Sequence, residues 1–114
     1  MNIVGPTQQL MAAALEVRSV RAKLLAQNVA NADTPGYLAR DINFQNAVDT
    51  MLSQGAVQSA GAATGAVAQN MQFDRNDVDL NQQLAKVDNN ALSYVATLKL
   101  YGDSMGRLQT AMAS

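Results

Sequence analysis

The chain has 114 residues, a net charge of −1, and neither cysteine nor histidine. Apolar residues make up 48% of it but aromatic residues only 4%, so we expect one domain with a core built from packed helices. The eight basic residues form no run, which leaves no electrostatic footprint for nucleic acid. The missing cysteine and histidine exclude thiol chemistry, most zinc sites and most nucleophilic triads, and we expect no enzyme, metal or cofactor.

The first predicted element is a helix from Thr7 to about Asn31. This stretch has good helix formers and no internal glycine or proline, and its apolar residues form a broad stripe at helical spacing. Pro35 ends the helix, and Pro35-Gly36 supplies the two central positions of a type II turn. Residues 1–9 have neither the basic start nor the apolar run of a secretory leader, and no later segment approaches a membrane span. We therefore expect no such leader and no membrane insertion.

The middle of the chain is predicted to be irregular. Residues 36–54 alternate loosely and then show a weak helical period, as a short extended arm followed by a short helix would. Residues 55–76 begin with GAVQSAGAATGAVAQN, which offers little apolar surface to offset the entropy of ordering. We expect a flexible segment there, between an N-terminal helix within residues 1–35 and a C-terminal helix within residues 77–114.

The C-terminal helix carries the longest regular pattern in the chain. Asp79, with Gln82 three residues later, marks its start, and the helix should run from Leu80 to about Met112. Along it, apolar residues alternate at spacings of three and four over four heptads, which predicts a narrow stripe packed against another helix. We call these residues the sequence seam: Leu84, Val87, Ala91, Tyr94, Leu98, Tyr101, Met105, Leu108 and Met112.

Polar residues allow alternative interpretations. Asp77 to Asp88 has the length of a calcium loop but lacks its glycine and its final glutamate, so the acids are better explained by helix capping. Asn28 and Asn31 follow the apolar row of the first helix. They could satisfy the last carbonyls of that helix or fix its register against a neighbour.

Two further sets of residues have alternative roles. Arg18, Arg21 and Lys23 could form a solvated face or a subunit contact. Gly102 and Gly106 are weak points of the second helix, or they allow another helix to approach closely.

The segment from Leu25 to Tyr37 resembles the N-terminal signature of the flagellar rod and hook family. Its pattern is Asn, a hydrophobic residue, Ala and Asn, then two variable residues and Thr-Pro-Gly-Tyr. The residues that match are Asn28, Val29, Ala30, Asn31, Thr34, Pro35, Gly36 and Tyr37. The continuation Leu38–Phe44 and the later Asn76–Asn81 are similar to proximal-rod members. Residues 55–70 lie outside the resemblance.

The resemblance implies a mostly α fold in which two long terminal helices pack as a coiled-coil-like pair. It also implies a structural subunit of the basal-body rod in the periplasm, exported by the flagellar type III pathway. Its partners would be copies of itself, other rod proteins, the rod-base adaptor, the membrane-anchored ring and the export gate. We further expect the Thr34–Tyr37 turn to aim the arm toward a neighbouring subunit. The alternative function is a soluble helical adaptor or chaperone of the secretion system.

Overall fold

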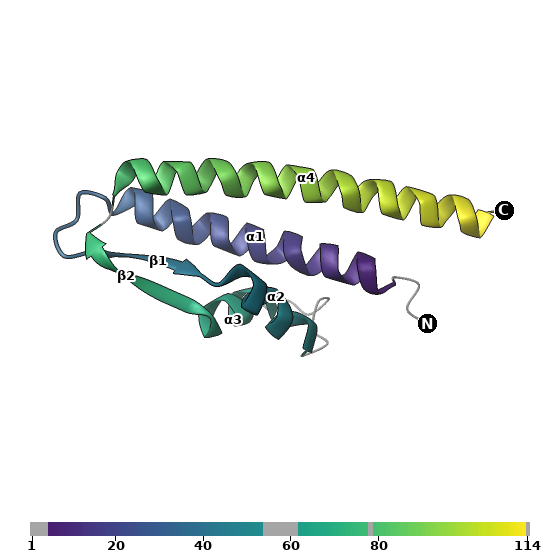
Figure 1. Ribbon diagram of the computed structural model, residues 1–114, viewed down its shortest axis with the longest axis horizontal. Coiled ribbons are helices and arrows are strands. Elements are labelled where there is room, and N and C mark those ends of the chain that lie inside the picture. The colour runs from purple at the N-terminus through teal and green to yellow at the C-terminus, as the bar shows by residue number, and fades with distance from the viewer. Residues whose placement is uncertain (1–4, 54–61, 78, 114) are drawn as a thin grey trace.

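The computed structural model describes residues 5–53, 62–77 and 79–113 and has principal extents of 60 × 26 × 19 Å. Its elements are α1 (Pro6–Ala30), β1 (Leu38–Ile42), α2 (Phe44–Ser53), α3 (Ala62–Gln69), β2 (Met71–Asp77) and α4 (Leu80–Ala113). Helix α1 lies between α4 on one side and the short helices and strands on the other (Figure 1). The mostly α class with two long paired terminal helices is confirmed.

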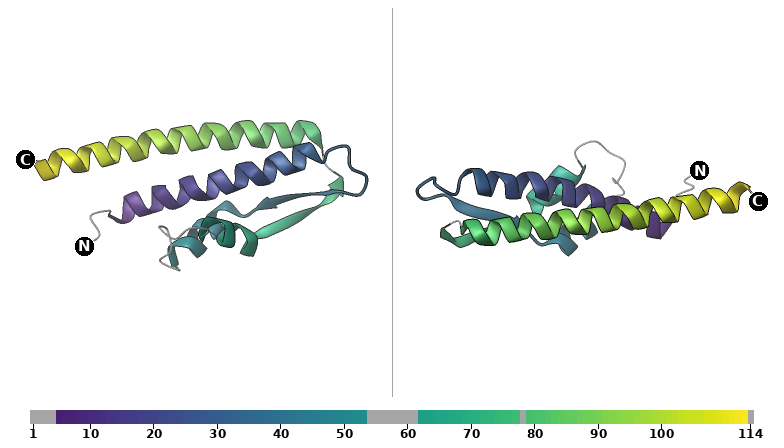
Figure 2. Two further views of the ribbon diagram at one scale, coloured as in Figure 1. Left: turned by 180° about the vertical axis from the view of Figure 1, so that it is seen from behind. Right: turned by 90° about the horizontal axis from the view of Figure 1, so that it is seen from above.

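Helices α1 and α4 run antiparallel, and α4 extends beyond the first turn of α1 (Figures 1 and 2). Both helices begin where the sequence predicts, to within one residue. Pro6 occupies the first turn of α1, where its missing N–H costs no hydrogen bond. At the start of α4, the Asp79 carboxylate accepts a hydrogen bond from the Gln82 N–H at 3.3 Å, so Asp79 acts as an N-cap.

The two helices are joined through an antiparallel pair of strands. Arg40, Asp41 and Ile42 of β1 face Phe73, Gln72 and Met71 of β2, and the register shifts between Leu38 and Arg40. Strand β1 therefore confirms the expected extended arm, and α2 confirms the short helix after it. The arm pairs with β2 and packs on α1 of its own chain, and its contact with a neighbouring subunit stays a prediction.

The apolar core lies on the side of α1 that faces away from α4. Buried side chains come from α1, β1, α2 and α3, and α4 contributes none. The members are Ala13, Val17, Leu24, Ile42, Ala47, Val48, Met51, Ala63, Ala66 and Val67.

The expectation of an irregular, flexible stretch over residues 55–76 was wrong for residues 62–76. Residues 62–69 form α3, in which Ala63, Ala66 and Val67 are buried, and β2 follows directly. Small side chains let α3 approach α1 and α2 closely, and this shared burial offsets the ordering entropy that local composition could not offset alone. Residues 55–61, which belong to the same prediction, lie outside the described residues.

Candidate functional site

The signature ends with the turn that follows α1. The Tyr37 N–H donates to the Thr34 carbonyl at 3.2 Å, and Gly36, the third residue of the turn, has φ +77°. These features confirm the turn expected from Pro35-Gly36, since a type II turn requires positive φ at that position. Tyr37 is half-buried, and its hydroxyl accepts a hydrogen bond from the Arg40 guanidinium at 3.2 Å.

The two signature asparagines have different roles. Asn31 is satisfied locally, because its side-chain amide donates to the Gln27 carbonyl at 2.8 Å and its side-chain oxygen accepts from the Thr34 hydroxyl at 3.2 Å. Between them Val29 is half-buried and Ala30 is exposed. Asn31 therefore satisfies a carbonyl at the end of α1, as the first of its two interpretations predicts.

Asn28 connects three elements and is completely buried. Its Nδ2 donates to the Arg40 carbonyl at 2.6 Å and to Gln83 Oε1 at 2.9 Å, and its Oδ1 accepts from the Arg40 N–H at 3.0 Å. The carboxamide thus satisfies the backbone of β1 as a neighbouring strand would, and it also contacts α4. Asn28 ties the end of α1 to the arm and to the first turn of α4.

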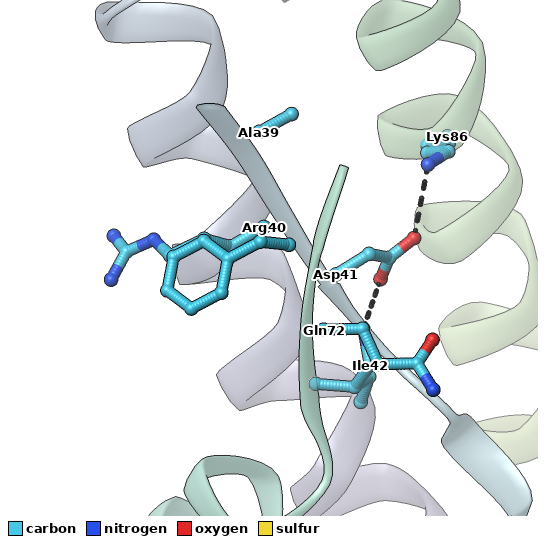
Figure 3. A pocket seen from close by; sticks show the side chains of 7 residues that line it. Ala39, Arg40, Asp41, Ile42, Gln72 and Lys86 are labelled. Atoms are coloured by element: carbon cyan, nitrogen blue, oxygen red, sulfur yellow. Dashed lines mark hydrogen bonds and ion pairs between the residues drawn. The ribbon is translucent and has the colours of Figure 1, made fainter. Parts of the chain in front are cut away.

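A second junction is built from charges. Asp41 of β1 accepts two hydrogen bonds from the Arg21 guanidinium, at 2.9 and 3.0 Å. It also forms an ion pair with Lys86 of α4 at 3.2 Å, which Figure 3 shows. Burial alone would raise the pKa of Asp41, but the hydrogen bonds from Arg21, the Ile42 N–H and Lys86, together with the charge of Arg21, outweigh it and lower the pKa below its ordinary value. The carboxylate is therefore held ionised between α1 and α4.

The three cations of α1 are not a uniform solvated face. Arg21 is committed to Asp41, and the Arg18 guanidinium lies 4.0 Å from the centre of the Phe44 ring. Burial, and secondarily the charge of Arg21, lowers the pKa of Arg18. Lys23 is exposed. Two of the three side chains therefore stabilise contacts within the chain.

Helix α4 meets α1 along a different line from the sequence seam. Its three buried residues are all polar: Gln83, Asn90 and Ser104. With half-buried Thr97 they form a column repeated every seven residues, which we call the polar column. It alternates with the half-buried Val87, Tyr94, Tyr101 and Leu108.

Only part of the sequence seam lies against α1. Five other members form a column of their own: Leu84, Leu98 and Met112 are 44%, 47% and 60% exposed, Ala91 is exposed, and Met105 is half-buried. We call these five residues the apolar column. Their burial against a partner remains a prediction.

The polar column is hydrogen-bonded along the whole length of α1. Besides the bond between Asn28 and Gln83, the Asn90 Nδ2 donates to the Arg18 carbonyl at 3.0 Å, and Gln8 donates to the Ser104 hydroxyl. Within the described residues, however, Gln83 Nε2 and Asn90 Oδ1 are buried without a partner. Each such atom costs about 1–3 kcal/mol. The side chains that α4 buries fully are therefore polar, and their hydrogen bonds make its pairing with α1 specific.

Comparison with known proteins identifies the family, although no family model matches the chain. The chain is 34% identical over 110 residues to the flagellar basal body rod protein FlgB of Yersinia ruckeri, covering 78% of this chain and 80% of that protein. It is 34% identical over 114 residues to FlgB of Aeromonas hydrophila, covering 87% and 86%. FlgB of Bacillus subtilis is 23% identical, with 98% and 97% covered.

The chain belongs to the FlgB family of flagellar basal body rod proteins. In this FlgB-family chain, the signature residues gather where α1, β1 and the start of α4 meet. The described helices include none long and apolar enough to cross a membrane. The described residues also include no group of three or more acidic, histidine or cysteine side chains that could hold a metal.

The residues of the polar column were not predicted from the sequence. Their signal was a heptad repeat of Gln83, Asn90, Thr97 and Ser104, each one position before a member of the apolar column. Counting apolar residues alone selects the apolar column, which lies on the other side of the Val87–Leu108 column from the polar column.

Proposed function

We propose that this chain is a structural subunit of the proximal rod of the bacterial flagellar basal body, polymerising with copies of itself and other rod proteins to transmit torque. The observation that carries the proposal is the apolar column of α4, because Leu84, Leu98 and Met112 remain exposed while the residues that α4 buries fully are polar. Leu80, Leu92, Val95 and Leu100 are also 45–71% exposed on α4. Apolar surface gathered along one helix is typical of interaction sites.

The fold suits a subunit that carries load. Helix α1 is held between the apolar core and α4, and the Asn28 and Asp41 junctions tie the arm to both long helices. Force applied to α4 is therefore passed to α1 and β1 through hydrogen bonds and ion pairs. A head-to-tail contact through α4 would continue from subunit to subunit, as a rod requires.

We further infer that the subunit lies in the periplasmic part of the rod and reaches it by flagellar type III export. Its additional neighbours would be the rod-base adaptor, the membrane-anchored ring and the export gate. The family supports this location, and the similarity of Leu38–Phe44 and Asn76–Asn81 to proximal-rod members supports the proximal type.

The test is complementation of a strain that lacks this protein, with electron microscopy of its basal bodies. The natural chain should restore complete rods, whereas Leu84→Gln/Leu98→Gln should be exported and folded but leave rods incomplete. Lys99→Gln, an exposed change on the same helix, serves as the control. Complete rods from the double variant would refute the apolar column as the assembly surface. A natural chain that stops at a small soluble oligomer would instead support an adaptor.

A further inference from the structure

Two seams share one helix. Helix α4 is hydrogen-bonded to α1 through the polar column, and the half-buried Val87, Tyr94, Tyr101 and Leu108 form the next column around the helix. The sequence seam combines the same four residues with the apolar column. At the 3.5 residues per turn of a helix pair, adjacent columns differ by one-seventh of a turn, so the two seams are related by a roll of about 50°.

Apolar burial alone would favour the rolled arrangement. In the observed rotation, Leu84 and Leu98 remain about half exposed, while Gln83 and Asn90 are buried and each leaves one polar atom without a partner in the described part of the chain. Rolling α4 so that the sequence seam faces α1 would bury the two leucines and return the unpartnered polar atoms to water. Something other than apolar burial must therefore hold the present rotation.

Hydrogen bonds and one ion pair supply that restraint. The contacts of Gln83 with Asn28, Asn90 with Arg18 and Ser104 with Gln8 are spread along the interface, so they fix rotation and register together. Lys86, which precedes Val87, adds its ion pair with Asp41 on the same side as the polar column. A roll would break all four contacts. Buried polar groups are known to specify register in helix pairs at a cost in stability.

There is also space for the roll. A groove of about 300 Å³ lies beside the contact, with Ala91 and Val95 of α4 on one wall and Ser19 and Ala22 of α1 on the other. A second hollow of about 220 Å³ continues it past Ala12 and Leu15. The α1 side chains that line this path are small apart from Leu15 and the flanking Arg18 and Glu16. Members of the apolar column could therefore move toward α1 without displacing the α1 side chains that belong to the apolar core.

We propose that the polar column is a rotational latch. Its hydrogen bonds hold α4 turned so that the apolar column faces outward, and without them α4 rolls about its Val87–Leu108 column and buries its leucines against α1. The latch thereby keeps the free subunit in a form that can assemble. This last step rests on the proposed function, whereas the roll itself does not.

The roll can be measured by the reactivity of single cysteines, since the chain has none of its own. Ala91→Cys reports on the exposed apolar column, and Thr97→Cys reports on the polar column at a position outside the three hydrogen bonds to α1. The latch variant is Gln83→Ala/Asn90→Ala. Its matched control is Gln82→Ala/Asn89→Ala, which removes the same residue types at the same spacing one position earlier, where both side chains are exposed. Maleimide labelling rates of the purified chain are compared, with helix content checked by circular dichroism.

In the natural background and in the control, the exposed position 91 should react faster than the half-buried position 97. In the latch variant the ratio of the two rates should fall by about tenfold or more, because each lost hydrogen bond shifts such an equilibrium several-fold. Adding Leu84→Gln/Leu98→Gln should restore the original ratio by removing the reason to roll. An unchanged ratio would overturn the latch. Equal acceleration at both positions would also overturn it, since α4 would then have detached.

Should the double variant fail to fold, Asn90→Ala alone is compared with Asn89→Ala by the same criteria. The assembly step is tested separately in the rod complementation assay, where the latch variant should be exported and give no rods. Rods from a latch variant with an inverted labelling ratio would overturn the assembly step while leaving the roll intact. Failure of the natural chain itself to form rods would refute the proposed function and leave the labelling result to decide the latch.

Discussion

The side chain of Asn28 makes two hydrogen bonds with the backbone of Arg40: its Oδ1 accepts from the N–H at 3.0 Å and its Nδ2 donates to the carbonyl at 2.6 Å. The same amide nitrogen reaches Gln83 at 2.9 Å, so one buried side chain sets the spacing of α1, β1 and α4. An exposed asparagine at a helix end has no comparable effect, because water can replace its hydrogen bonds.

Asn28→Ala should therefore destabilise the chain by about 2–3 kcal/mol, because it leaves the Arg40 backbone and Gln83 without their partner in a buried place. Asn31→Ala, which removes only contacts within the same turn, should cost about 1 kcal/mol or less. Urea unfolding of the purified variants measures both. Similar losses from the two changes would contradict a special role for Asn28.

Leu98→Ala separates folding from assembly. Leu98 is 47% exposed, so its truncation should change the free energy of unfolding by about 1 kcal/mol or less, far below the 2–5 kcal/mol typical of a fully packed residue. Rod formation should nevertheless be lost if the apolar column meets another subunit. Met51→Ala, in the core at 1% exposure, is the opposite case and should unfold the chain. A strongly destabilised Leu98→Ala chain would show that this residue is packed within its own subunit.

The contacts of the Asp41 carboxylate with Arg21 and Lys86 should make a contribution to stability that acid removes. The pKa of Asp41 in the folded chain lies below the ordinary value of 3.8, so the folded state binds its proton less readily than the unfolded state. The stabilisation is therefore fully present above about pH 4 and is lost as the pH falls through the lower folded pKa. Asp41→Asn should lower stability at neutral pH and flatten this part of the pH profile. An unchanged slope between neutral pH and about pH 3 would show that Arg21 and Lys86 do not stabilise the carboxylate.

The long helices, the turn and the arm could all be predicted from local rules. Helical spacing, Pro35 and the Asp79 cap act within a few residues, and each element lies where these signals place it. Helix α3 could not be predicted, since its alanines gain stability only from burial against α1 and α2. Strand β2 depends likewise on its pairing with β1.

For a similar reason, the sequence pattern could not show whether the polar or the apolar column of α4 faces α1. Tyr94 belongs to either seam, and the decision between Asn90 and Ala91 beside it is made by the Arg18 carbonyl, 72 residues earlier in the chain. Sequence spacing shows that two faces exist. It does not show which one the first helix takes.

Gly36 gives the sharpest test of the signature turn. Its φ of +77° is strained for any residue with a Cβ, and a Cβ at this position would meet nothing within 4 Å, so backbone strain alone decides the outcome. Gly36→Val should lower the free energy of unfolding by about 1–3 kcal/mol or more and move β1 away from its hydrogen bonds with Asn28. Gly36→Asn should be milder because asparagine tolerates this conformation. Tyr37→Phe, which loses only the hydrogen bond from Arg40, should also be mild. The measurement is rod completion, scored by the appearance of distal rod and hook, with export of each variant measured separately. Normal rods from well-exported Gly36→Val would show that assembly does not need this turn, and the signature would then be better explained as an element recognised during export.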